Sequence, residues 1–392
     1  MNRGRIASID ILRALTMVLM IWVNDFWTLT GVPKWLQHAS ASEDYLGFSD
    51  VIFPLFLFIV GLSIPFAIKQ RQNKGDSLVS ISKHIIIRSL SLLIIGVFMV
   101  NYESAHLSLG IGKYWWCVLM ALAVVLIWMH WEKSPISKKW HPILQSIGIL
   151  ILIYLSFVYK GGANGDIGMK THWWGILGLI GWAYLVNALA YVFSKGNLYI
   201  MLTLLLVFNA LAIFGQMDLL PPLNKNLSFL SVIYGGTIPA LTSAGIVATM
   251  LYKKLSVNHS KWIFITLIVI GIIFISFGLL TRPIWGISKL QGTPSWLAIC
   301  SGIGFISFAI LYFIADIKKQ TNWAKIIAPA GTATLTCYMI PYFVYPLKNI
   351  IEIRFPEFLN TGIIGLIGSF VFALLVVFFT GWIEEKGYKL KL

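Results

Sequence analysis

Long apolar runs alternate with short polar connections along the whole chain. Runs of about 18–23 residues can cross a hydrocarbon core of about 30 Å as helices, at about 1.5 Å of rise per residue. Only helices and closed barrels satisfy their backbone in lipid, and runs of this length are helical. We count twelve such runs. The seventh, eleventh and twelfth are the weakest, so the chain has eleven or twelve predicted spans. The predicted spans lie near 9–29, 47–69, 83–101, 113–130, 142–159, 172–193, 198–216, 230–251, 260–280, 296–315, 325–346 and 361–382.

The basic residues in the connections predict the side that each connection faces. With the N-terminus in the cytoplasm, the cytoplasmic connections hold 19 of the 30 Lys and Arg residues and the outer connections hold 9. The remaining two, Arg13 and Arg88, fall within spans. Because Lys and Arg concentrate in the cytoplasmic loops of membrane proteins, this asymmetry predicts a cytoplasmic N-terminus. The longer connections then face outward, near 30–46, 160–171, 217–229, 281–295 and 347–360.

Composition agrees with an all-α polytopic membrane bundle, since 58% of the residues are hydrophobic, 11% are charged and the mean hydropathy is +0.81. The net charge of +15 is dispersed over the connections and forms no single stripe, which argues against a nucleic-acid partner. We find no soluble insertion and no fixed repeat, so we treat 1–392 as a single transmembrane domain. Cys117, Cys300 and Cys337 lie in apolar spans without metal-ligand spacing, and we predict neither disulfides nor a metal site.

Ionisable side chains at membrane depth cost free energy and therefore need a partner or a purpose. Asp10 and Arg13 are three residues apart in the first span, which places them on one helix face where they can pair. A capping carboxylate with a nearby counter-ion explains them, and so does contact with a cytoplasmic ligand. Asn24 lies about 21 Å along the helix from Asp10, too far to share one small site.

Asn24, His38 and Asp50 all lie at the predicted outer boundary of the membrane. Histidine is the natural proton acceptor near neutral pH. A nearby carboxylate would orient the ring, and an Asn could orient a substrate or a developing oxyanion. From position alone, however, an exposed loop residue is the favoured explanation of His38. The segments Arg282–Trp296 and Cys337–Pro346 also draw attention, because Pro and Gly there break helix ends and expose backbone groups.

Ordered motifs in the first seventy residues resemble the heparan-α-glucosaminide N-acetyltransferase family, including its bacterial membrane relatives. The segments are "RIASIDILRALTMVLMIWVND" and "QHASASEDYLGFSDVIFPLFLFIVGLSI", with R-x-x-S-x-D-x-x-R, V-N, H-A and D-x-x-F-P-x-F-x-F-I-x-G in that order. "ISKLQGTPSW" and "GTATLTCYMIPYF" resemble later motifs of the same family. Ala14 stands where the family usually has Gly. We expect no lumenal domain ahead of the first span, which favours a small sugar over a polymeric substrate.

The resemblance implies an acyltransferase of the bacterial inner membrane that uses acetyl-CoA from the cytoplasm to acetylate a glucosamine-type amino sugar on the other side. It places the active histidine at His38 and the first-helix asparagine at Asn24, and Asp50 matches the family pattern. His38 would act as general base or as acetyl carrier. The implied partners are the lipid bilayer and a small sugar, and we keep a homodimer as a hypothesis. The expected cofactor-binding residues at the inner end are Asp10, Arg13, Lys83 and Arg88.

Two other functions fit the same pattern. Twelve spans with polar residues at depth and Pro- or Gly-broken helices also describe an amino-sugar transporter. An O-acetyltransferase of surface glycans would share the transmembrane acetyl transfer but use a hydroxyl acceptor. Binding of coenzyme A separates the transporter from the enzymes, and the acceptor atom separates the two enzymes.

Overall fold

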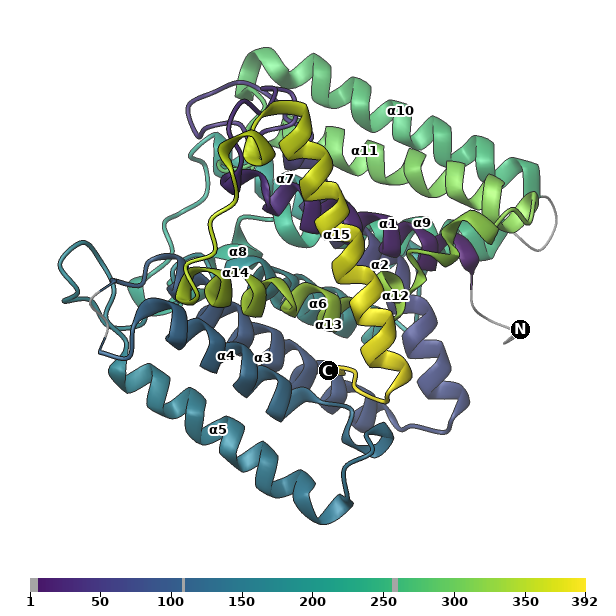
Figure 1. Cartoon of the computed structure of the whole chain (residues 1–392). Helices are drawn as coiled ribbons and strands as arrows, with labels where there is room; N and C mark the ends of the chain where they lie inside the picture. The colour runs from purple at the N-terminus through teal and green to yellow at the C-terminus, as the bar shows by residue number, and fades with distance from the viewer. Residues whose placement is uncertain (1–5, 108–109, 256–259) are drawn as a thin grey trace. The chain divides into compact units, whose positions relative to one another are not determined.

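The computed structural model describes residues 6–107, 110–255 and 260–392 (Figure 1). These residues form helices joined by loops, and the predicted all-α class is confirmed. The longer helices are α1 (Ala7–Asn24), α2 (Ser49–Asn73), α3 (Leu78–Glu103), α4 (Lys113–Trp128), α5 (His141–Val158), α6 (Gly175–Phe193), α7 (Leu198–Gln216), α9 (Thr237–Leu255), α10 (Ser260–Trp285), α11 (Pro294–Leu311) and α15 (Gly362–Glu385).

In the described part of the chain, nine helices are long and apolar enough to cross a membrane. A tenth span results if the bent pair Asn226–Tyr234 and Thr237–Leu255, which turns by 41°, counts as one. The bend falls at Gly236, whose φ of +71° favours glycine and whose added Cβ would lie 2.2 Å from the Phe208 carbonyl oxygen. The eighth predicted span is therefore a broken helix.

The eleventh predicted span, 325–346, also differs from one continuous helix. It consists of α12 (Ala328–Thr332), α13 (Thr334–Met339) and α14 (Pro341–Ile350). Pro329 and Pro341 each occupy the first turn of a new helix, and Ala333 between α12 and α13 has a non-helical φ of −120° and ψ of 46°. Proline is well placed in a first turn and cannot continue a preceding helix, so the apolar run divides at these points.

The chain divides into two compact units. The first comprises Met1–Thr16, Pro33–Leu90 and Leu179–Lys325, and the second comprises Met17–Val32, Ser91–Gly178 and Ile326–Leu392. Each unit draws on three separate stretches, and α1, α3 and α6 contribute residues to both. A single membrane domain over the whole chain remains our prediction.

In the first unit, α10 packs along α11, and α2 packs along α9 (Figure 1). Gly61 and Gly245 allow the close approach of α2 and α9, since a Cβ at either would lie 2.0 Å from a carbonyl oxygen of the other helix. The Thr242 and Thr249 hydroxyls donate to the α2 carbonyl oxygens of Leu57 and Leu62 at 3.2 and 2.8 Å. Small residues and interhelical hydrogen bonds therefore hold this pair together.

In the second unit, α4 packs against α5 and α14, and α15 packs against α12 and α13 (Figure 1). The indole of the fully buried Trp116 on α4 donates to the Leu155 carbonyl oxygen on α5 at 3.0 Å. The three cysteines are buried and free. The broken helices α13 and α14 are held here between longer ones.

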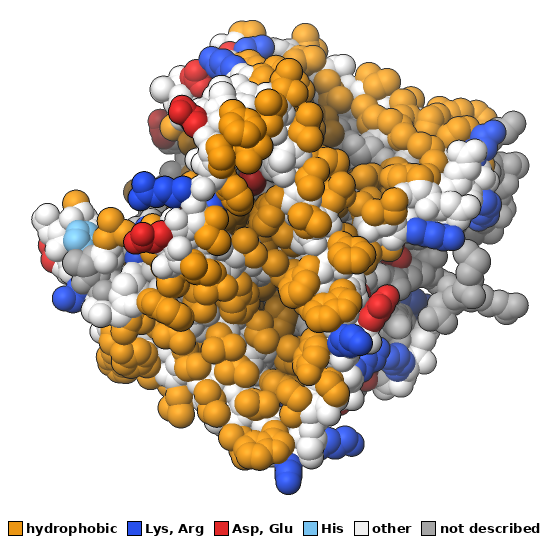
Figure 2. Space-filling view, viewed as in Figure 1, with side chains coloured by type: hydrophobic (Ala, Val, Ile, Leu, Met, Phe, Trp, Pro, Cys, Tyr) orange, Lys and Arg blue, Asp and Glu red, His pale blue; other side chains and the backbone are white. Residues whose placement is uncertain are grey.

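Large hydrophobic side chains are exposed along α5, α10 and α15, and Figure 2 shows how much of one face such side chains cover. Examples are Phe157 on α5, Leu280 on α10 and Phe378 on α15, which are 84%, 78% and 75% exposed. Apolar surface this extensive marks an interaction with another apolar phase. Together with the number of long apolar helices, it identifies a polytopic membrane protein whose helix faces contact lipid.

Candidate functional site

Two loops of the first unit, residues 34–50 and 282–293, fold onto each other, and we refer to them as the loop cluster. Asp44 joins them, because its carboxylate accepts from Arg282 Nε at 2.8 and 3.1 Å and from the Ile287 N–H at 2.6 Å. The Tyr45 N–H in turn donates to the Ile287 carbonyl oxygen at 3.1 Å. The hydrogen bond from Arg282 holds the pKa of Asp44 below its usual value, so this link is charged at neutral pH.

The loop cluster brings His38 and Asp50 together, as the sequence predicts. Asp50 Oδ1 lies 2.7 Å from His38 Nδ1, and Oδ2 accepts from the Ala39 N–H at 2.9 Å and the Gly47 N–H at 3.3 Å. The Asp50 side chain is 1% exposed and lies in the first turn of α2, where the helix dipole favours negative charge. Gly47 is required for this fold-back, since a Cβ would lie 1.8 Å from the Gln37 carbonyl oxygen.

This network selects the tautomer of His38. A carboxylate oxygen accepts at 2.7 Å only if Nδ1 carries the proton, which leaves the Nε2 lone pair free to accept a proton or to attack a carbonyl carbon. The His38 side chain is 47% exposed, and within the described residues Nε2 has no hydrogen-bond partner. The arrangement is therefore a histidine oriented by a buried carboxylate, with its reactive nitrogen accessible.

Lys289 is a third member of the loop cluster that the sequence analysis did not assign. Its Nζ lies 3.3 Å from His38 Nδ1 and 3.9 Å from Asp50 Oδ1, and its side chain is 23% exposed. Burial lowers the pKa of Lys289, while the charge of Asp50 acts in the opposite direction. Its position in the Pro- and Gly-rich segment Arg282–Trp296 was the available signal, but the distance of 251 residues from His38 concealed the contact.

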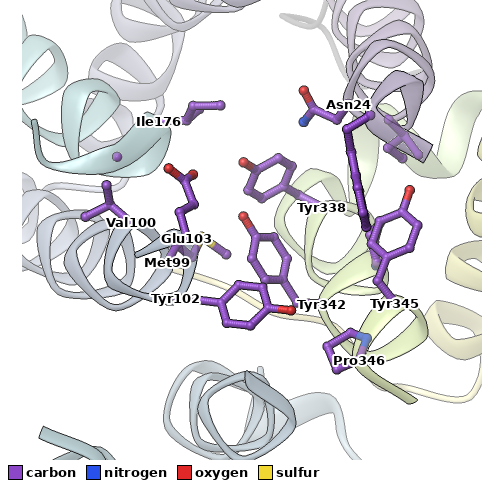
Figure 3. A pocket seen from close by; sticks show the side chains of 14 residues that line it. Asn24, Met99, Val100, Tyr102, Glu103, Ile176, Tyr338, Tyr342, Tyr345 and Pro346 are labelled. Atoms are coloured by element: carbon purple, nitrogen blue, oxygen red, sulfur yellow. The ribbon is translucent and has the colours of Figure 1, made fainter. Parts of the chain in front are cut away.

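Asn24 lies in the second unit, where it lines a cavity of about 340 Å³ (Figure 3). The structure describes the two units separately, so a site shared by Asn24 and His38 remains a prediction. Aliphatic and aromatic side chains form most of the cavity wall, and Glu103 at the end of α3 contributes a carboxylate (Figure 3). The tyrosines that line the cavity are Tyr102, Tyr338, Tyr342 and Tyr345. Sequence reasoning singled out Cys337–Pro346 for its broken helix but assigned no role to Glu103.

A hydrogen bond joins α14 to Asp25, the residue that follows α1, beside this cavity. The Tyr345 hydroxyl donates to Oδ1 of the buried Asp25 at 2.6 Å, and the Tyr345 ring packs edge-on against Trp27 with centroids 5.5 Å apart. The Cys117 thiol on α4 donates to the Tyr342 carbonyl oxygen at 3.5 Å. This carbonyl lacks a helical donor because Pro346, four residues later, has no N–H. The irregular backbone of α13 and α14 is thus partly satisfied by protein contacts.

At the predicted inner end of the first unit, Asp10 and Arg13 pair at 3.1 Å, as their spacing predicts. Arg13 Nη2 also donates to Ser63 Oγ at 2.6 Å. The N-terminal cap of α1 is a different carboxylate, because Asp316 accepts from the Ala7 and Ser8 N–H groups at 3.0 and 3.1 Å. Asp10 therefore pairs with Arg13, and Asp316 caps the N-terminus of α1.

Lys83 and Arg88 lie five residues apart on α3, in the part of that helix that belongs to the first unit. Lys83 is exposed, and the Arg88 guanidinium lies 5.0 Å from the centre of the Tyr184 ring. The buried Arg88 Nε has no hydrogen-bond partner within the described residues. An unsatisfied guanidinium donor and an exposed ammonium suit a phosphate ligand, whereas Arg13 is already held by Asp10 and Ser63.

The fold defines a polytopic helical membrane protein, and the loop cluster gives it a carboxylate-oriented histidine. Residues 5–167 match the family model for the catalytic region of heparan-alpha-glucosaminide N-acetyltransferase, which confirms the family resemblance over this part of the chain. The matched range contains every predicted site residue but excludes Lys289 and the tyrosines of α13 and α14.

Two curated proteins are similar to the chain over a shorter range. Heparan-alpha-glucosaminide N-acetyltransferase of Mus musculus is 34% identical over 100 residues, which cover 26% of this chain and 14% of the mouse protein. The Homo sapiens protein of the same name is 33% identical over 97 residues, which cover 25% of this chain and 14% of the human protein. The match thus spans about one seventh of each relative.

Proposed function

We propose that this protein is a transmembrane acetyltransferase that moves the acetyl group of cytoplasmic acetyl-CoA to a glucosamine-type amino sugar on the other side of a bacterial inner membrane. The observation that carries the proposal is the His38–Asp50 pair, in which a buried carboxylate leaves an accessible Nε2 as base or nucleophile. The names of the curated relatives and of the matching family model support the acetyl group and the amino sugar.

His38 can serve the transfer in two ways. In direct transfer, Nε2 accepts the proton that the acceptor nitrogen loses as it bonds to the acetyl carbon, and passes it to the departing thiolate sulfur. In two-step transfer, Nε2 itself bonds to the acetyl carbon as the carbon–sulfur bond breaks. The acceptor nitrogen then displaces the imidazole, and its proton passes through the released Nε2 to the thiolate. Asp50 stabilises the positive charge that develops on the ring in both routes.

Lys289 places a positive charge beside the same ring. A cation at this position stabilises negative charge on the carbonyl oxygen or the leaving sulfur. At the other end of the first unit, Lys83 and Arg88 would bind the phosphates of coenzyme A, and Asp10 would position Arg13 beside them. The inward position of these residues follows from the predicted topology.

An amino-sugar carrier is the second candidate, and the broken helices favour it. Interrupted helices such as α12 to α14 and the bent pair before α9 are typical of transporters that bind a substrate at mid-membrane. An O-acetyltransferase would use the same histidine with a hydroxyl acceptor.

Reconstituted protein in liposomes tests the proposal. With labelled acetyl-CoA and glucosamine, we expect His38→Ala to lower label transfer by about 10²- to 10⁴-fold, the usual contribution of a general base. His106→Ala, in another loop on the predicted outer side, is the matched control and should retain transfer. Absence of transfer by the wild type, with glucosamine crossing the bilayer, would refute the enzyme and favour the carrier. Transfer of the label to glucose, supplied in place of glucosamine, would show O-transfer.

A further inference from the structure

Two polar side chains of the second unit line the same cavity. Asn24 ends α1 and Glu103 ends α3, and Figure 3 shows both side chains directed into the cavity. Within the described residues, neither the Asn24 amide nor the Glu103 carboxylate makes a hydrogen bond or an ion pair. Glu103 is exposed and Asn24 is half-buried, so both groups are accessible to a ligand in the cavity that supplies hydrogen-bond donors.

The rest of the wall combines aliphatic and aromatic side chains, and four of the aromatic ones are tyrosines. Tyr338 and Tyr342 direct their hydroxyls toward the space between Asn24 and Glu103 (Figure 3), and their ring centroids lie 5.9 Å apart. Trp27 lies on the wall as well, so that apolar ring faces and phenolic oxygens alternate around one carboxylate. Aromatic faces attract cations and pack on apolar C–H surfaces, while the hydroxyls both donate and accept hydrogen bonds.

A basic neighbour does not neutralise the carboxylate by direct contact. Lys113 Nζ donates to the main-chain oxygen of Glu103 at 3.3 Å and lies 5.3 Å from the centre of the Tyr102 ring. Its ammonium is thus held by a backbone group and a ring, and the Glu103 carboxylate remains directed into the cavity (Figure 3). A cavity of about 340 Å³ is of the size that binds small molecules.

We propose that this cavity binds a hydroxylated primary amine in its protonated form, with Glu103 as the counter-ion of the ammonium group. Asn24, Tyr338 and Tyr342 bond to the hydroxyls of the ligand, and the aromatic faces pack against its carbon skeleton. The inference rests on the proposed function in that it names the residues that hold the acceptor amine, whose ammonium group gives one proton to the Glu103 carboxylate before the nitrogen attacks the acetyl carbon. It also gives a reason for product release, because an acetylated amine is neutral and loses the ion pair with Glu103.

Binding without acetyl-CoA tests the cavity separately from catalysis. Isothermal titration of the purified full chain with D-glucosamine, N-acetylglucosamine and glucose should show tightest binding of glucosamine. Glu103→Gln should weaken glucosamine binding by about 10- to 100-fold, the value of a charged hydrogen bond, and change the two neutral sugars little. Glu357→Gln, a carboxylate of the same unit outside the cavity, is the matched control and should bind glucosamine as the wild type does.

The outcomes separate this inference from the proposed function. Glucosamine binding that depends on Glu103 upholds the cavity even if no acetyl transfer is found. Acetyl transfer with glucosamine binding unchanged by Glu103→Gln overturns the cavity and leaves the enzyme. If the variant fails to fold, the wild type still decides, because equal affinity for glucosamine and N-acetylglucosamine overturns the role of the carboxylate.

Discussion

The loop cluster of the first unit and the cavity of the second unit use their polar groups in opposite ways. In the loop cluster, Asp50 is bonded to His38 and to two backbone N–H groups. In the cavity, Asn24 and Glu103 have no such bonds within the described residues. A group that performs chemistry must be held in one orientation before the substrate arrives, whereas a group that binds a ligand can await it. The difference supports our proposals of reactivity for the first region and recognition for the second.

The local construction of each region explains the difference. Asp50 is held by the first turn of α2 and by a loop whose N–H groups point at the carboxylate, so the backbone itself orients the side chain. The cavity is lined by helix ends and by the short helices α13 and α14, which leave room between them. The side chains that these short helices direct into the cavity therefore remain uncovered by neighbouring helices.

The largest effect beyond that of His38 is expected from Asp50→Asn. The amide oxygen would take the Ala39 and Gly47 N–H groups, so that the amide NH₂ faces Nδ1 and drives the ring proton to Nε2. We expect the transfer rate to fall by about 10²- to 10⁴-fold with little change in KM for glucosamine, as for the loss of a general base. Glu43→Gln, which alters a partly exposed carboxylate of the same cluster that pairs with Lys34, is the control. Wild-type rates for Asp50→Asn would disprove the oriented histidine.

In the second unit, Tyr345→Phe should reduce stability and leave chemistry intact. The variant removes the hydroxyl that donates to the buried Asp25 at 2.6 Å and leaves that carboxylate without this donor. A hydrogen bond to a charged group contributes about 1.5–3 kcal/mol, so the midpoint of thermal unfolding in detergent should fall. Tyr338→Phe is a useful comparison, because its hydroxyl is assigned to ligand binding and its loss should affect glucosamine affinity more than unfolding. The reverse pattern would contradict the division between the two tyrosines.

A smaller, pH-dependent effect is expected from Lys289. Because its pKa is lowered in the folded protein, Lys289 loses its charge at a pH below the usual lysine value, and the transfer rate should fall over that range. Stability should change in the other direction, since the unfolded chain binds the proton more tightly and unfolding becomes less favourable as the pH rises through this window. Lys289→Met should remove both pH dependences. Rate and unfolding profiles of Lys34→Met, an exposed lysine of the same cluster, serve as the control.

Local spacing allowed part of this protein to be predicted from the sequence. Apolar runs long enough to cross a bilayer predict a helical membrane protein, because a helix satisfies its own backbone hydrogen bonds in lipid. The Asp10–Arg13 pair was also predictable, because residues three apart share a helix face. The 325–346 segment is the exception, where hydropathy indicated one span and the prolines divided it into three short helices.

The loop cluster and the cavity required the tertiary structure. His38 and Asp50, which lie twelve residues apart, were identified from the sequence. Lys289 comes from a distant loop, and the Asp44–Arg282 link holds that loop against them. In the sequence, Glu103 is an ordinary polar residue at the end of a predicted helix. Only the packing around it shows that its carboxylate faces the cavity. Hydropathy and local spacing record what each segment prefers on its own. Which side chains from distant segments meet, and which are left without a partner, depends on how the helices pack.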